Sequence, residues 1–397
     1  MIRVEEAFKI VQEGCLTLRV EEIDILHSAG RVLAEPIHTD RDFPPFNRVA
    51  MDGIAIASEF FTSANQEFVI EGTQAAGTPQ RKLSNPSHCI EVMTGAMLPE
   101  GTNAVIRYED LEIKSGKAKV LLEKIDGGMN VHPQAQDAKQ GEVLLVPGQK
   151  ISSAEVALLA SIGKSNVNVF ALPKTAVIST GDELVGISHT PAPHQIRRSN
   201  TYALQAAMRE LHWESEAFHI ADSKSEIKSS LHKILQDNDV LILSGGVSKG
   251  KFDFIPEVLD ELGIQKRFHQ VNQRPGKPFW FGTSVDGKKI VFALPGNPVS
   301  TFLCFFKYIK PWFLKSCGVA TKPLSAVLAA DVSFTPPLTY FIQVRTEMHS
   351  GTLMAYPNAG GGSGDFANLK NIDGFLELPP EKSEFKAGKS FPFISFR

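Results

Sequence analysis

Side chains that could handle an oxyanion occur in three separate loops of this sequence. Asp182 and Glu183 follow an apolar run of strand length, and Asp253 ends a glycine-rich loop. Arg274 and Lys277 stand on either side of a Pro-Gly pair. Carboxylates can hold Mg²⁺ together with phosphate oxygens and water, whereas Arg and Lys supply positive charge to an oxyanion. Because no nucleophile-base pair accompanies them, these residue types indicate phosphate or oxyanion chemistry and not acyl transfer.

The glycine-rich loop at 244–254 allows two interpretations. Its glycines let the backbone approach a ligand, and its amides and serine hydroxyls could cradle an anion. An ordinary turn without chemistry is the alternative, because short glycine motifs produce many false matches. Asp182 and Glu183 could likewise be a turn and N-cap pair, and Lys249 and Lys251 a solvated loop face.

The sequence around these loops follows an α/β pattern, whose strands and helices would position them. Apolar runs at 175–180, 240–243 and 289–294 predict strands of a parallel sheet that is buried on both faces. Amphipathic stretches after Ser199-Asn200 and after Ser223 predict helices capped by those residues. Ligands of open α/β sheets bind beyond the carboxyl ends of the strands, so the loops should meet at one rim. The pattern predicts a three-layer α/β domain.

Strand and turn patterns dominate the rest of the chain. Short β-like runs alternate with turns from 68 to 145, and β-like runs return after Pro323. The fold class expected is α/β plus β, in several domains. These are a helical and extended N-terminal domain at 1–45 and 138–172, an inserted β domain at 46–137, the α/β domain at 173–320 and a C-terminal β-barrel at 321–397.

Composition narrows the class of protein. The 397 residues suggest two or three domains, and the net charge of -3 gives no reason to expect nucleic-acid binding. The four cysteines are scattered without metal-ligand spacing, which is typical of reduced thiols. The N-terminus lacks an apolar signal core, and no apolar run reaches membrane-spanning length. We therefore expect a cytoplasmic protein with no nucleic-acid or membrane partner.

Six motifs, in order, resemble those of the molybdopterin molybdenumtransferase family, which includes the MoeA proteins and the E domain of gephyrin. They are AMDG at 50–53, MTGAMLPEGTNAV at 93–105, STGDEL at 179–184, SGGVS at 244–248, RPGKP at 274–278 and LPGNPVS at 294–300. The resemblance implies a homodimer of multi-domain subunits with an α/β molybdopterin-binding domain. It also implies that molybdate is inserted into adenylylated molybdopterin, with release of AMP and a requirement for Mg²⁺. The molybdopterin adenylyltransferase and acceptor molybdoenzymes would be further partners.

The resemblance also assigns roles to individual residues. The implied catalytic residues are Asp253, Glu183, Asp182 and Lys277, of which the three carboxylates would also bind the metal. The implied substrate-binding residues are Ser248, Gly245, Gly246, Arg274, Pro278, Ser300, Asp52, Thr94, Asp137, Arg345 and Ser363. Asp52, Thr94 and Asp137 could reach the cleft from the partner subunit of such a dimer.

The chain departs from the family pattern at several positions. Lys249 and Lys251 replace an apolar and an acidic residue, Arg198 stands where an acidic residue is common, and the segment 132–137 lacks the expected arginines. These changes motivate one alternative, a catalytically weakened paralogue that binds molybdopterin or acts as a scaffold. A second alternative is the related adenylyltransferase step, but the flanking β domains argue against it.

Overall fold

The computed structural model describes residues 1–247, 253–362 and 364–397, which form two compact units. The first unit comprises Met1–Ala34, Pro147–Ser152 and Asn166–Arg397, and the second comprises Glu35–Val146 and Ser153–Ser165. Each unit has hydrophobic cores of its own. No helix of the described residues combines the length and the apolar character needed to cross a membrane.

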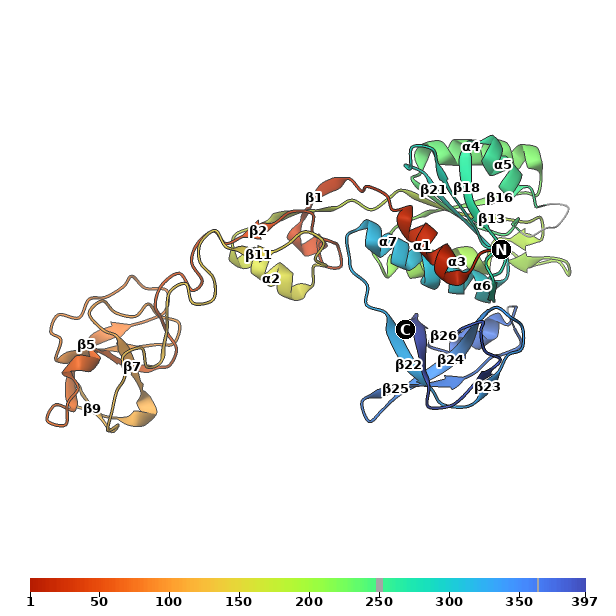
Figure 1. Cartoon of the computed structure of the whole chain (residues 1–397). Helices are drawn as coiled ribbons and strands as arrows, with labels where there is room; N and C mark the ends of the chain where they lie inside the picture. The colour runs from red at the N-terminus through yellow and green to blue at the C-terminus, as the bar shows by residue number, and fades with distance from the viewer. Residues whose placement is uncertain (248–252, 363) are drawn as a thin grey trace. The chain divides into compact units, whose positions relative to one another are not determined.

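A six-stranded sheet forms the centre of the first unit (Figure 1). Its order is β16 (Glu216–Ile220), β13 (Thr175–Thr180), β17 (Val240–Ser244), β21 (Ile290–Leu294), β20 (Trp280–Ser284) and β18 (Ile264–His269). The first four strands run parallel, whereas β20 and β18 pair antiparallel. The three strands predicted from the sequence, β13, β17 and β21, are parallel as expected, whereas the antiparallel edge was not predicted. Edge strand β18 was missed because its middle residues, Gln265 to Arg267, are exposed and polar, so it has no continuous apolar run.

Helices cover both faces of this sheet (Figure 1). On one face, α4 (Lys224–Asp237) and α5 (Ile255–Glu261) pack against alternate residues of β17, Leu241 and Leu243. The other residues of β17, Val240 and Ile242, share a core with the opposite helical layer. That layer consists of α1 (Val4–Glu13), α3 (Ser199–Arg209), α6 (Pro298–Cys304) and α7 (Lys310–Ser316). The predicted three-layer α/β domain is confirmed.

Two predicted helix starts differ in detail from the structure. Arg198, and not Ser199 or Asn200, is the N-cap residue of α3. Ser223 does precede α4, but its hydroxyl lies 3.0 Å from the Ser225 hydroxyl and caps no helical N–H. A π-helical turn, Phe305–Ile309, separates α6 from α7.

A five-stranded barrel closes the C-terminal part of the first unit, as predicted. It closes because β24 (Thr339–His349) pairs with both β25 and β26. Its other strands are β25 (Thr352–Pro357), β22 (Leu324–Leu328), β28 (Ser390–Ser395) and β26 (Gly374–Leu378). The short β19 (Gln273–Arg274) pairs in parallel with β24, so the barrel adjoins the loop that carries Arg274 and Lys277.

Shorter elements complete the first unit. Paired strands are β1 (Val20–Asp24) with β12 (Asn166–Phe170), β14 (Leu184–Val185) with β15 (Ile196–Arg197), and β23 (Val332–Ser333) with β27 (Glu384–Phe385). Short 3₁₀ helices occupy Ile25–His27 and Phe366–Asn371.

The second unit is built on a six-stranded sheet. Its order is β7 (Ala104–Arg107), β4 (Gly53–Ile56), β6 (His88–Val92), β5 (Glu67–Gln74), β9 (Lys117–Val120) and β8 (Leu111–Lys114). Further elements are β2 (Ile37–His38) with β11 (Val143–Leu145), β3 (Arg48–Val49) with β10 (Val131–His132), helix α2 (Ser153–Ser161) and the turns Ser58–Phe60 and Tyr108–Asp110.

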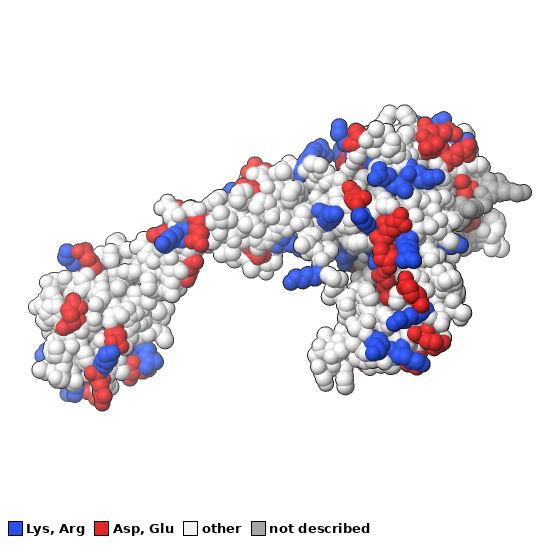
Figure 2. Space-filling model, in the orientation of Figure 1, with Lys and Arg blue, Asp and Glu red and all other residues white. Residues whose placement is uncertain are grey.

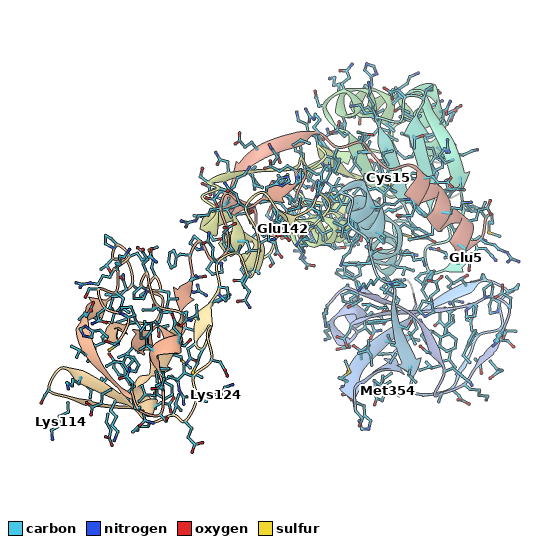
Figure 3. The ribbon with its side chains drawn as sticks, turned by 60° about the vertical axis from the view of Figure 1, so that its left-hand side comes forward. Glu5, Cys15, Lys114, Lys124, Glu142 and Met354 are labelled. Atoms are coloured by element: carbon cyan, nitrogen blue, oxygen red, sulfur yellow. The ribbon has the colours of Figure 1, made fainter. Side chains whose placement is uncertain are left out.

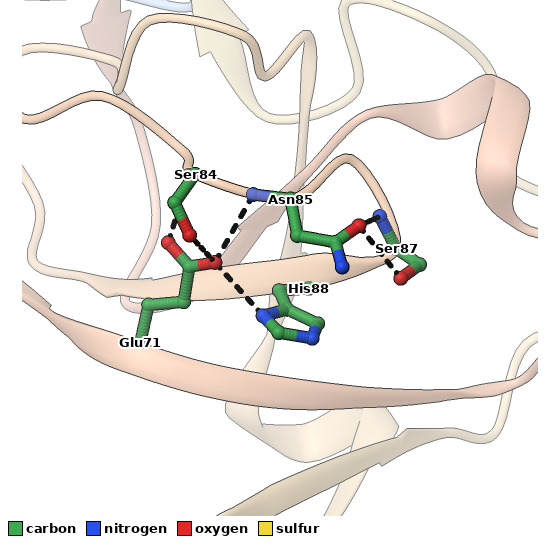
Figure 4. A network of polar contacts seen from close by, with 5 residues as sticks. All are labelled: Glu71, Ser84, Asn85, Ser87 and His88. Atoms are coloured by element: carbon green, nitrogen blue, oxygen red, sulfur yellow. Dashed lines mark hydrogen bonds and ion pairs between the residues drawn. The ribbon is translucent and has the colours of Figure 1, made fainter.

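A carboxylate network ties β5 to the loop before β6 (Figure 4). The Glu71 carboxylate accepts hydrogen bonds from the Ser84 amide and hydroxyl, at 2.9 and 2.5 Å, and lies 2.8 Å from Nδ1 of His88. The Ser84 hydrogen bonds lower the pKa of Glu71 to about 2. Glu71 is therefore ionised at neutral pH, and its carboxylate holds this loop in place.

Charged side chains of both signs are scattered over the face drawn in Figure 2. Glu5 of the first unit and Lys114 of the second are exposed (Figure 3), and basic and acidic side chains lie next to one another on the face drawn in Figure 2. The four cysteines are unpaired, and Cys15 follows α1 (Figure 3).

Candidate functional site

A cavity of about 550 Å³ lies at the carboxyl ends of the parallel strands. Thr180 lines it at the end of β13, followed by Gly181 and Glu183. The glycine pair 245–246 lines it after β17, and residues 295–297 line it after β21. The loops that follow the three predicted strands therefore meet at one site, where open α/β sheets bind ligands.

Glycines allow the close approach of these loops. At Gly245, where φ is +105°, a Cβ atom would lie 2.9 Å from the carbonyl oxygen of Thr180. At Gly246, where φ is +67°, it would lie 2.8 Å from Cγ1 of Ile255. Any larger residue would meet both a steric clash and an unfavourable backbone conformation. Ser248, Lys249 and Lys251 lie outside the described residues.

Four carboxylates gather at this cavity, one more than the sequence analysis identified. Glu183, Asp253 and the unpredicted Asp222 line it, whereas Asp182 lies beside it and accepts a hydrogen bond from the Asp222 amide at 3.1 Å. Burial, followed by the negative charges of Asp182, Glu183 and Asp253, raises the pKa of Asp222. Asp222 was not predicted as a site residue because β16 was not predicted, although the alternating apolar residues Phe218 and Ile220 were an available signal.

The carboxylates suit a hard cation that is held by few protein ligands. Among residues 1–247, 253–362 and 364–397, no three His, Cys, Asp or Glu side chains are arranged to hold a metal ion. Mg²⁺ needs no such group, since one or two carboxylates usually bind it together with water and substrate phosphates. Burial first, and then the neighbouring carboxylates, raise the pKa of Asp222, and a bound cation would offset the charge part of this cost.

Arg274 and Lys277 bring positive charge to the wall of the same cavity. They belong to a loop that a buried side-chain amide holds in place. The Gln273 side chain is 1% exposed, and its Nε2 donates to the carbonyl oxygens of Pro275 and Gly276, each at 3.2 Å. The guanidinium carbon of Arg274 lies 5.9 Å from the ring centre of Phe334. These contacts hold two cations at the cavity wall.

Ser300 and Pro278 also line the cavity, with Ser300 in the first turn of α6. Arg345 does not line it. Its guanidinium forms an ion pair with Glu347 at 2.9 Å and lies 5.5 Å from the ring centre of Tyr356. Ser363 lies outside the described residues.

The three remaining predicted residues belong to the second unit. Oδ1 of Asp52 accepts hydrogen bonds from the amide and hydroxyl of Thr94, at 2.6 and 2.8 Å. These bonds hold the pKa of Asp52 below its usual value. Asp137 lies 3.0 Å from Nε2 of His132, whose Nδ1 lies 3.1 Å from the Arg48 guanidinium. Within this unit Asp52 pairs with Thr94, whereas Asp137 belongs to a separate charged cluster.

Comparison with known proteins finds matches along nearly the whole chain. Three family models match in succession: "MoeA N-terminal region (domain I and II)" at residues 2–163, "Probable molybdopterin binding domain" at 176–315 and "MoeA C-terminal region (domain IV)" at 325–396. A molybdopterin molybdenumtransferase from Synechocystis is 40% identical over 399 residues, with 100% of both chains covered. The chain belongs to the molybdopterin molybdenumtransferase family. The predicted family, and the predicted transferase function in molybdenum cofactor biosynthesis, are thereby confirmed.

Other members of the molybdopterin molybdenumtransferase family agree in sequence and fold. The Bacillus subtilis protein is 29% identical over 412 residues, which cover 100% of this chain and 94% of its own. Two crystal structures of the molybdopterin biosynthesis MoeA protein from Pyrococcus horikoshii superpose with TM-scores of 0.84 and 0.86, at 30% and 27% identity. Each alignment covers 100% of this chain and 99% or 100% of the other. The predicted multi-domain fold class is therefore confirmed.

Proposed function

We propose that this molybdenumtransferase inserts molybdate into adenylylated molybdopterin and releases AMP. The observation that carries the proposal is the composition of one cavity, which joins Arg274 and Lys277 to Glu183, Asp222 and Asp253. The cavity lies in the region matched by the molybdopterin-binding family model. Such a site combines positive charge for an oxyanion with carboxylates for a phosphate-bound cation.

Molybdate would bind on the cationic side of the cavity. Molybdate is a tetrahedral dianion, so charge-assisted hydrogen bonds from a guanidinium and an ammonium group bind it well. Arg274 and Lys277 supply these groups, and the Ser300 hydroxyl lines the same cavity. Gln273 keeps the loop in place before the anion arrives, which lowers the entropic cost of binding.

Mg²⁺ would be held by one or two of Glu183, Asp222 and Asp253. When bound, it would neutralise charge on the phosphate oxygens of the substrate. We assign Asp253 the central catalytic position, because it lines the cavity directly after the glycine-rich loop. Asp182 supports the cluster through its hydrogen bond to the Asp222 amide.

The family resemblance supports three further parts of the proposal. We expect a cytoplasmic homodimer in which Asp52, Thr94 and Asp137 act at a cleft of the partner subunit. Arg345 and Ser363 stay candidates for molybdate binding. The adenylyltransferase that supplies the substrate and the molybdoenzymes that receive the cofactor are expected partners.

The test is AMP release from adenylylated molybdopterin, measured with and without molybdate and Mg²⁺. Asp253→Ala should abolish molybdate-dependent AMP release while the far-UV circular dichroism spectrum stays unchanged. Asp260→Asn is a matched control, since Asp260 lies on the adjoining helix α5 and is exposed. AMP release that is independent of molybdate, or unchanged in Asp253→Ala, would refute the proposal. Substrate binding without AMP release would instead favour the scaffold alternative.

A further inference from the structure

A second, smaller cavity of about 280 Å³ adjoins the larger one. The two share five lining residues, namely Thr180, Glu183, Gly245, Gly296 and Asn297. The smaller cavity also contacts the start of helix α3, from Arg197 to Thr201. A single elongated ligand could therefore occupy both cavities.

The smaller cavity is lined by buried polar atoms that lack protein partners. Oγ1 of Thr180, Oγ1 of Thr201 and Nε of Arg198 are each buried without a hydrogen-bond partner among the described residues. Both threonines are 4% exposed. Unpaired buried polar groups cost free energy, so three of them around one cavity indicate that a ligand completes their hydrogen bonds.

The neighbouring polar groups are already paired within the protein. Nδ2 of Asn200 donates to Oγ of Ser244 and to the carbonyl oxygen of Gly296, both at 2.8 Å. Nε of Arg197 donates to the His189 carbonyl oxygen at 3.2 Å. Asn200 and Arg197 thus use these polar groups within the protein, whereas the unpaired atoms of Thr180, Arg198 and Thr201 can bind a ligand.

The charge of the wall selects an anion. Two arginines line the smaller cavity, and Glu183 is its one carboxylate among the described residues. The N-terminal end of α3, which begins at Ser199, adds a partial positive charge. A guanidinium and two hydroxyls match the oxygens of a tetrahedral phosphate.

We propose that the smaller cavity is a phosphate subsite, in which Arg198, Thr180 and Thr201 bind a phosphate group of the substrate. Molybdate binds separately, because Arg274 and Lys277 line the larger of these two cavities and not the smaller one. The identity of the substrate rests on the proposed function, whereas the anion subsite rests on the cavity itself. The phosphate group and molybdate would thus lie on either side of the residues that the two cavities share, which include Glu183.

Two variants test the separation of the anion sites by calorimetric titration of the full chain. Arg198→Gln should weaken binding of inorganic pyrophosphate about tenfold and leave molybdate binding within about twofold. Lys277→Gln should do the reverse. Arg209→Gln is the matched control, because Arg209 lies at the other end of α3 with a side chain that is 67% exposed. Loss of both anions in both variants would mean one common site and would overturn the proposal.

Thr201→Val provides a test that does not depend on charge. Valine has nearly the same shape but no hydroxyl, so the variant should bind pyrophosphate more weakly while its thermal stability without ligand is kept or raised. Unchanged pyrophosphate affinity in both Thr201→Val and Arg198→Gln would overturn the subsite. Failure of the wild type to release AMP, with Arg198-dependent pyrophosphate binding intact, would refute the proposed function and leave the subsite standing.

Discussion

The hydroxyl of Tyr308 donates a hydrogen bond to the amide oxygen of Gln273, and both side chains are buried. The other end of the Gln273 amide holds the backbone between Arg274 and Lys277. Tyr308 belongs to the π-helical turn that follows α6, and such turns are frequent at functional sites. A residue outside the cavity therefore positions the two cations that line it.

Loss of the Tyr308 hydroxyl should loosen this loop. Tyr308→Phe leaves the Gln273 oxygen without its donor, so we expect the free energy of unfolding to fall by about 1 kcal/mol. The Kd for molybdate should rise about threefold to tenfold, with a smaller change in kcat at saturating molybdate. Calorimetry and the dependence of AMP release on molybdate concentration measure both. Tyr202→Phe, at a side chain that is 45% exposed, is the control, and an equal molybdate Kd in all three proteins would contradict the positioning role.

Gly276 should not tolerate a side chain. Its φ is +91°, and a Cβ atom would lie 2.5 Å from Nε2 of Gln273 and 2.9 Å from Sγ of Cys304. Gly276→Ala should thus weaken molybdate binding and destabilise the protein. Gly287→Ala is a matched control, since Gly287 has φ of +70° but nothing within 4 Å of such a Cβ. The control isolates the backbone cost of about 1 kcal/mol. Equal losses of stability in the two variants, measured by urea unfolding, would show that the steric contact is unimportant.

The carboxylate of Asp222 should lower the stability of the folded protein and support its activity. Its folded-state pKa is raised, so its ionised form destabilises the folded protein at neutral pH. Asp222→Asn should increase the free energy of unfolding at pH 7 by about 0.5 kcal/mol or more, and reduce Mg²⁺-dependent AMP release about tenfold or more. The stability difference should vanish as the pH falls and wild-type Asp222 becomes protonated. Exposed Asp237, at the end of α4, serves as the control through Asp237→Asn. A variant that is less stable than wild type at pH 7 would contradict this account.

Glu71 should make the second unit sensitive to acid. Its pKa of about 2 lies below the ordinary value of 4.5, so its contribution to stability is complete above pH 4.5 and is lost as the pH falls toward 2. At pH 7, Glu71→Gln should lower the free energy of unfolding by about 1 to 2 kcal/mol, because hydrogen bonds to a charged acceptor are lost. Hydrogen exchange of the amides at 84 and 85 reports on this loop. Glu112→Gln, at an exposed position of β8, should leave their exchange unchanged. Equal protection in wild type and Glu71→Gln would count against the network.

Local pattern was sufficient for the α/β core and for the loops that carry the site. The runs that became β13, β17 and β21 are buried throughout and mostly apolar because both faces of the sheet are covered, which makes such strands visible in a sequence. The glycines after β17 were visible as well, because a glycine pair directly after an apolar strand is a local sequence pattern. The motifs around Asp182, Asp253 and Arg274 then predicted oxyanion chemistry and the family.

Only the tertiary structure brought Asp222 and Arg198 to the site. Strand order in the sheet is not sequence order, and β16 pairs with β13, so Asp222 joins carboxylates from distant segments. Arg198 becomes a candidate for anion binding only in the folded chain. There the unpaired hydroxyls of Thr180 and Thr201, from separate elements, line the same cavity. Burial and missing partners are properties of the packed chain. The sequence determined which chemical groups were present, and folding decided which of them act together.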